Sequence, residues 1–238
     1  MRKIFYSFII LCFGFNITGQ GVWFDTGLKV QYGGSALLNS VVTANPDYSY
    51  AISTGFGIGG KLGVNFDNGG GFALDIMRSN AKGAYSQIGQ SENVETQWKS
   101  LDLYLTYRSS FNASYIEIGP KLGFLNSVNN NIIGTEIDQS DNFSGSAYAA
   151  MFGFGTYLIG SDGRFSGIFG IRLEYGLNDL VNKTNGESVG APVFDSTVYA
   201  EEYSKSNPVF VGVVFELNWG LGYYGKASCG QRGKFIWL

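Results

Sequence analysis

The residues that could do chemistry are acids and bases that occupy every second position between apolar neighbours. Asp25 and Lys29 show the spacing in one segment, and Arg172 and Glu174 show it in another. Because side chains alternate across a β-strand, such charges would all share one face. Carboxylates and cations gathered on one face could serve acid–base catalysis, ion or proton movement, or salt bridging. The set contains Asp25, Lys29, Lys61, Asp75, Asp102, Arg108, Glu117, Lys121, Arg172, Glu174 and Glu216.

The chain contains no histidine. Histidine is the usual general base of hydrolases and acyltransferases because its pKa lies near neutrality. No Ser-His or Cys-His pair can therefore form, and no histidine-based metal site either. A Ser-Lys pair or a carboxylate dyad stays open, but no motif supports one. We predict no catalytic residue, no cofactor and no bound metal.

The elements that would position these charges are segments with a hydrophobic period of two. Each has about the 9–11 residues that a tilted strand needs to cross a bilayer. The eight segments cover residues 22–32, 50–66, 72–77, 101–108, 116–124, 148–158, 169–178 and 209–219.

The connections between the segments alternate between short and long. Short turns are expected at 67–70, 109–114 and 161–164, and long polar loops at 34–48, 79–97, 126–142 and 179–207. This alternation is typical of outer-membrane barrels, which carry short turns and both termini on the periplasmic side. A soluble lipocalin-like barrel or sandwich is the alternative, but its exposed face should carry many Lys and Glu residues.

We therefore predict an all-β fold: an eight-stranded antiparallel transmembrane outer-membrane β-barrel with a filled polar lumen. The lumen of such a barrel is only wide enough to hold side chains, and a buried charge without a partner is strongly destabilising. A structural salt-bridge network is favoured over an ion path or a catalytic cluster. Five aromatic residues near strand ends are expected in aromatic girdles: Trp98, Tyr107, Trp219, Tyr223 and Tyr224. The predicted network comprises Lys29, Lys61, Asp75, Asp102, Arg108, Glu117, Lys121, Arg172, Glu174 and Glu216.

The N-terminus has the pattern of a secretory signal peptide over residues 1–19. Arg2 and Lys3 precede an apolar run at 4–15 that is too short to span a bilayer, and cleavage is expected near Gly19. Loss of these two cations from 16 basic residues leaves 14 against 19 acidic ones, a net charge of −5. This balance argues against a nucleic-acid partner.

The barrel is expected to occupy residues 20–224 and to be followed by a periplasmic C-terminal tail at 225–238. The tail has basic side chains and an apolar end, which fits either a frayed terminus or a docking peptide. The docking interpretation involves Lys226, Cys229, Arg232, Lys234, Phe235 and Trp237.

Three strand segments resemble the outer-membrane β-barrel domain family of Bacteroidota, the group that includes PorT-like proteins. They are YIEIGPKLGF at 115–124, GIRLEYGLN at 170–178 and LDLYLTYR at 101–108. The resemblance implies an outer-membrane location, and some members of that family serve type 9 secretion. It supplies no catalytic residues.

These patterns predict a non-enzymatic outer-membrane protein, with the Gram-negative outer membrane as its location and membrane lipid around it. Its leading role is that of a structural or accessory subunit of an outer-membrane or periplasmic assembly for secretion or membrane biogenesis. The alternatives are an adhesion or ligand-binding barrel that acts through its loops, and a small passive channel.

Overall fold

The protein is described from a computed structural model that covers residues 22–66, 69–89, 93–132, 134–160, 165–181, 183–184, 187–188 and 204–221. The predicted signal peptide at 1–19, its cleavage near Gly19 and the predicted tail at 225–238 lie outside these residues. The same holds for the expected barrel limits at 20 and 224, for the turn at 161–164 and for Tyr223 and Tyr224.

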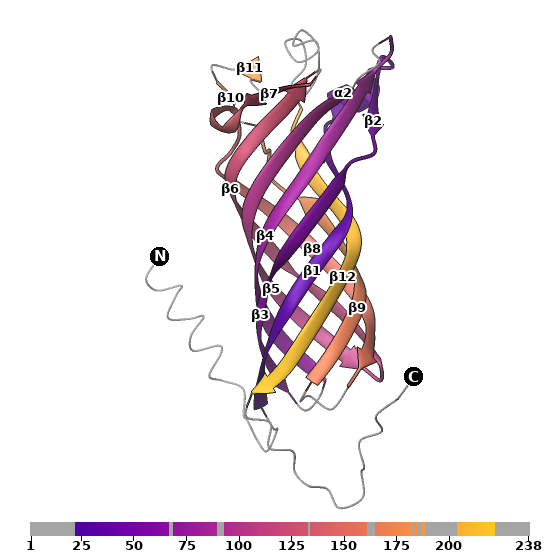
Figure 1. The fold of residues 1–238 in the computed structure, drawn as a ribbon, viewed down its shortest axis with the longest axis vertical. Helices are drawn as coiled ribbons and strands as arrows, with labels where there is room; N and C mark the ends of the chain where they lie inside the picture. Colours follow the sequence, from indigo (N-terminus) through magenta and orange to yellow (C-terminus); the bar gives the residue numbers. More distant parts are fainter. Residues whose placement is uncertain are drawn as a thin grey trace, which may run out of the picture.

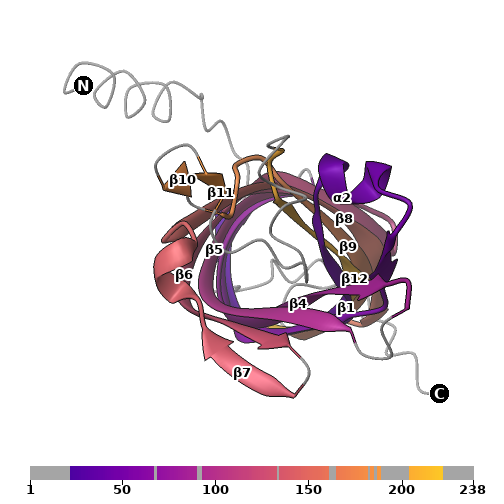
Figure 2. The ribbon, with the colours of Figure 1, turned by 90° about the horizontal axis from the view of Figure 1, so that it is seen from above.

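Eight long antiparallel strands close into a barrel (Figures 1 and 2). Each strand pairs with the next along the chain, and the ring closes where the first strand pairs with the last, from Phe24 opposite Leu221 to Leu38 opposite Asn207. The strands are β1 (Val22–Leu38), β3 (Thr54–Phe66), β4 (Gly70–Gln87), β5 (Val94–Phe111), β6 (Ser114–Ile132), β8 (Ser146–Ile159), β9 (Phe165–Gly176) and β12 (Asn207–Leu221).

The outside of the barrel is apolar. Phe24, Leu28, Leu62, Ile118 and Leu217 point outward, and the first four keep 54–60% of their surface exposed. A soluble protein does not leave so many large apolar side chains in water. The alternation is therefore inverted relative to a soluble barrel, and the fold is a transmembrane barrel of the outer-membrane type, as predicted.

No helix within the described part of the chain is long and apolar enough to cross a membrane.

The first residues of β1 and the last residues of β12 lie at the same end of the barrel as the short turns (Figure 1). Gly69, in the turn between β3 and β4, has φ +80, and Asn112, between β5 and β6, has φ 55. Glycine and asparagine are the residues that adopt this left-handed conformation most readily, which is why these turns can be so tight. The small elements gather at the opposite end, which is the extracellular one if termini are periplasmic: α2 (Ser40–Ala44), β2 (Tyr48–Ala51), β7 (Thr135–Asp138), η1 (Ser140–Asn142), β10 (Lys183–Thr184) and β11 (Glu187–Ser188).

Three of the predicted long loops are wrong in part, because strands continue into them. β1 runs to Leu38, β4 runs to Gln87, β5 begins at Val94 and β6 runs to Ile132. The predicted strand at 50–66 is in fact two strands, separated at Ile52 and Ser53. The apolar alternation ends where the strands leave the membrane, although the backbone hydrogen bonding continues beyond it.

The continuing strands form a five-stranded antiparallel sheet at the loop-bearing end, which we call the extension. Its order is β2–β4–β5–β6–β7. β2 pairs with β4 above the start of β3, and β7 pairs with β6 above the start of β8 (Figure 1). Tyr85 packs inside the extension with Val42 and Tyr48. One side of the barrel wall is therefore taller than the other.

Candidate functional site

The barrel interior is built by strands whose inward positions alternate between charged and very small residues. On β3, Lys61 is flanked at inward positions by Gly59 and Gly63. A Cβ at position 63 would overlap the Asp25 carboxylate, and one at Gly153 would lie 2.7 Å from Glu117 Cγ. These glycines leave the space in which long side chains cross the lumen.

Six charged side chains from six strands form a closed ring of ion pairs across the lumen, which we call the charge ring. Positive and negative groups alternate around it, with nitrogen-to-oxygen distances of 2.5–3.2 Å. All six side chains are buried, with at most 7% of their surface exposed. In order around the ring they are Lys29, Asp75, Arg172, Glu117, Arg108 and Glu216, and the last contacts Lys29 again.

Lys61 and Asp25 extend the charge ring toward the short-turn end. Lys61 Nζ lies 2.9 Å from Glu216 Oε1 and 3.1 Å from Asp25 Oδ2. Asn218 also donates to Glu216, at 2.6 Å. The eight charges of this assembly cancel, and their mutual attraction offsets part of the cost of removing them from water.

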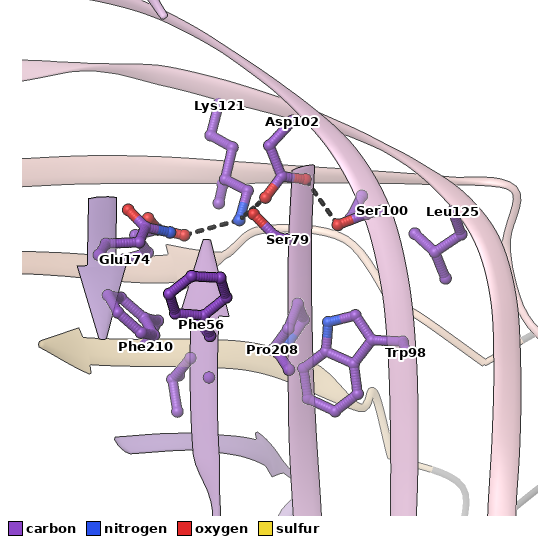
Figure 3. Close-up of a pocket in the computed structure, with 16 residues that line it drawn as sticks. Phe56, Ser79, Trp98, Ser100, Asp102, Lys121, Leu125, Glu174, Pro208 and Phe210 are labelled. Atoms are coloured by element: carbon purple, nitrogen blue, oxygen red, sulfur yellow. Dashed lines mark hydrogen bonds and ion pairs between the residues drawn. The ribbon is translucent and has the colours of Figure 1, made fainter. Parts of the chain in front are cut away.

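A second ion-pair cluster lies on the loop-bearing side of the ring. Figure 3 shows its three members, Lys121, Asp102 and Glu174. Lys121 Nζ lies 2.8 Å from Asp102 and 2.7 Å from Glu174. Tyr104 donates to Glu174 at 2.9 Å, and the Arg172 guanidinium lies 4.6 Å from the centre of the Tyr104 ring. Tyr104 thus connects this cluster to the charge ring.

A small cavity opens above this cluster, with a volume of about 40 Å³. Ser79, Ser100 and Lys121 line it on the polar side, and Trp98 and Phe210 on the apolar side (Figure 3). At 10–15 Å³ for each water centre, this space suits roughly three water molecules and no larger ligand.

The loop-bearing end of the lumen contains a cluster of buried apolar side chains, which we call the apolar plug. This was not predicted from the sequence, which indicated a polar lumen throughout. The expected girdle position of Trp98 is wrong, because its side chain is 7% exposed and faces inward, whereas Trp219 and Tyr107 are more than 40% exposed on the outside. The plug consists of Leu37, Trp98, Val128, Phe143, Leu180 and Val181.

The structure places all the predicted network residues in the lumen and brings them into the two linked clusters. Lys121 is the most accessible of them, with a side chain 17% exposed. The sequence pattern missed Tyr104 and the buried methionines that pack against it, Met77 and Met151. The sequence feature that could have identified them is their spacing, because each lies an even number of residues from other inward-facing positions on its strand. The predicted docking residues Lys226, Cys229, Arg232, Lys234, Phe235 and Trp237 lie outside the described residues.

Within the described ranges, no three residues among His, Cys, Asp and Glu are grouped so that they could hold a metal ion. Each acid of the charge ring instead contacts at least two cations. The arrangement can hold strands in register, and it fills the path that an ion would take.

Comparison with known proteins finds no matching family model and no matching curated sequence. Among solved structures, the chain is similar to Neisserial surface protein A, with 9% identity over 84% of this chain and 98% of that one, at a TM-score of 0.43. It is similar to the outer membrane protein OprG from Pseudomonas aeruginosa, with 14% identity over 84% and 96%, at a TM-score of 0.33. A third similar structure is the translocator domain of the autotransporter NalP from Neisseria meningitidis, with 10% identity over 92% and 95%, at a TM-score of 0.33.

Proposed function

We propose that this protein is a non-enzymatic outer-membrane scaffold, an accessory subunit that holds a protein partner of an envelope assembly at the cell surface. The observation that carries the proposal is the extension, whose last strand, β7, pairs with β6 on one side only within the described residues. A free strand edge offers unpaired backbone groups, to which a partner can add a strand.

The chemistry of β7 suits a protein partner. All four residues of Thr135–Asp138 are exposed, and Ile137 keeps 40% of its surface accessible. Glu136 and Asp138 flank this apolar side chain with negative charge. An extended segment with one apolar contact and basic neighbours would complement the edge.

The passive-channel alternative is disfavoured by two obstructions in series. The charge ring crosses the lumen in the middle, and the apolar plug with Trp98 and Phe143 lies at the loop-bearing end. We expect purified protein in planar bilayers to give no steady conductance. A stable open level in the wild-type protein would contradict the scaffold role and favour the channel.

A role in secretion or membrane biogenesis is supported by the resemblance of the strands at 101–108, 115–124 and 170–178 to the PorT-like barrels of Bacteroidota. The adhesion alternative uses the same surface but a ligand from outside the cell. The two roles differ in where the partner comes from. An envelope partner would be cross-linked to the protein in a pure culture of its own cells, whereas an external ligand would be absent from that culture.

The test is site-specific photo-cross-linking in living cells. A photoreactive residue at position 137 should give a discrete protein adduct, whereas the same residue at Val213, which faces lipid on β12, should give none. Reversal of charge by Glu136→Lys with Asp138→Lys should abolish the adduct. Labelling at 137 that equals labelling at 213, together with migration of the protein alone in native gels, would refute the proposal.

A further inference from the structure

Charged side chains on the barrel wall are sorted almost completely to the inside. On the eight barrel strands only four charged residues occupy outward positions, and all four lie on the neighbouring strands β4 and β5. They are Arg78, Lys82, Glu95 and Lys99. β1, β3, β6, β8, β9 and β12 have no outward charge within their described ranges. A net charge of +2 on one patch of an otherwise uncharged wall requires an explanation.

The strand register places the three cations around Asn80. Lys99 on β5 is the Cα partner of Asn80, and Arg78 and Lys82 stand two residues before and after Asn80 on β4. Lys99 is thus the diagonal neighbour of both other cations, at the roughly 7–8 Å that separates diagonal positions in an antiparallel pair. Three like charges at that spacing repel one another unless an anion lies between them.

Two of the three cations form no ion pair with the part of the chain that the structure describes. Lys82 pairs with Glu95 at 3.1 Å, with both side chains more than one third exposed. Arg78 and Lys99 are exposed, and no ion pair joins either of them to a described residue. Gln97 donates to Asn80 Oδ1 at 2.7 Å, which leaves the Asn80 amide hydrogens directed away from that bond. The patch therefore presents hydrogen-bond donors and an excess of positive charge.

The patch lies at the upper limit of the lipid-facing surface. On β4 the outward residues change from apolar to polar after Ile76, at Arg78, and on β5 the same change occurs between Leu101 and Lys99. Ile76 and Leu101 are 44% and 40% exposed and belong to the apolar band. A ligand that covers both regions has acyl chains below and an anionic head above.

We infer that Arg78, Lys82 and Lys99 bind the phosphate groups of an outer-leaflet glycolipid whose acyl chains lie along the apolar faces of β4 and β5. The guanidinium group of Arg78 can hold a phosphate with two parallel hydrogen bonds, and Lys99 supplies a point charge from the other side. Cations at a membrane surface attract anionic lipid heads strongly enough for three of them to act together. This inference rests on the transmembrane barrel and is independent of the proposed protein partner.

The test uses the full-length protein in phosphatidylcholine nanodiscs that contain diphosphoryl lipid A or its dephosphorylated form. Native mass spectrometry counts the lipids that remain bound. We expect retention of diphosphoryl lipid A and about fivefold weaker retention for each of Arg78→Gln and Lys99→Gln. The triple variant with Lys82→Gln should retain it no better than the wild-type protein retains the dephosphorylated lipid.

Lys205→Gln is the matched control, because it removes one exposed cation from a loop outside the patch. It should leave retention unchanged. Competition with inorganic phosphate separates the two sources of the anion: weak displacement at millimolar concentration supports a lipid headgroup, and full displacement overturns it in favour of free phosphate. Equal retention of the two lipid forms, or equal losses in Lys205→Gln and Arg78→Gln, would also overturn the inference.

Discussion

Basic residues on the inner and outer faces of the barrel wall have opposite environments. Inside, Lys29 and Arg172 are fully buried, and each contacts two carboxylates. Outside, Arg78 and Lys99 are exposed, and no ion pair joins them to the described acids. The inner cations are committed to the fold, whereas the outer cations are available to a ligand. Residue type alone therefore does not separate a structural charge from a binding charge; the face of the strand does.

The largest effect is expected from Arg172→Met, which removes one cation of the charge ring and leaves its acids short of positive charge. Breaking a buried pair in this way costs about 3–5 kcal/mol of unfolding free energy. Urea unfolding in detergent micelles, followed by tryptophan fluorescence, measures it. The control is Arg78→Met, the same substitution on the outer face, which should change stability by less than about 0.5 kcal/mol.

The double variant Arg172→Met with Asp75→Asn sharpens this test, because it restores the balance of charge. It should be more stable than the sum of the two single changes predicts, by about 0.5–3 kcal/mol of coupling energy. Strict additivity would mean that the two side chains do not act as one network.

A smaller loss is expected when a lumen glycine gains a side chain. Gly63→Ala places a methyl group against Asp25 and should cost about 1–3 kcal/mol, as overpacking of a filled interior does. Gly34→Ala on β1 is the matched control, since its nearest neighbours would be 3.9 Å away. If both variants unfold at the same urea concentration, the lumen is looser than the structure indicates.

The outer patch should contribute almost nothing to folding. Arg78→Gln combined with Lys99→Gln is expected to change the unfolding free energy by less than about 0.5 kcal/mol, because exposed side chains without partners lose little on truncation. The heat-modifiable shift on gels should be retained. A loss as large as that of Arg172→Met would assign these cations to the fold instead.

The smallest effect concerns Asp138, at the end of β7 and outside the membrane. The Ser140 hydroxyl and backbone N–H donate to its carboxylate and lower its pKa below the ordinary value of 3.8. A lowered folded-state pKa stabilises the local turn above the ordinary pKa, and this contribution disappears as the pH falls through the lowered value. Carboxyl NMR titration should show the depression, and Ser140→Ala should reduce it.

The inward charges could be predicted because parity is preserved along each strand. The residue numbers of Arg172 and Glu174 differ by an even number, and so do those of Asp25 and Lys29. The face assigned to one member of a pair therefore fixes the face of the other. Their pairing could not be predicted, since it joins residues from opposite walls whose separation depends on barrel closure and tilt. Arg172 with Asp75 is one example.

Trp98 shows where parity reasoning failed. Its inward parity with Ser100 and Asp102 was present in the sequence, but its size and position near the strand end favoured a girdle. The plug partners that bury it, Phe143 and Leu180, come from loop segments without periodicity. The ends of β4 and β5 were missed for a related reason: above the membrane, neither face needs to be apolar.

The charge ring also bears on how the barrel assembles. Lys29 and Glu216 are Cα partners in the β1–β12 pair that closes the wall, so their contact exists only once the first and last strands have met. Before closure, Lys29 and Glu216 lack this contact, and a slip of the seam by one residue turns Glu216 toward the lipid. An open or misaligned sheet is therefore penalised in the bilayer. The ring therefore stabilises the correctly closed barrel relative to open barrels and to barrels whose β1–β12 register is shifted.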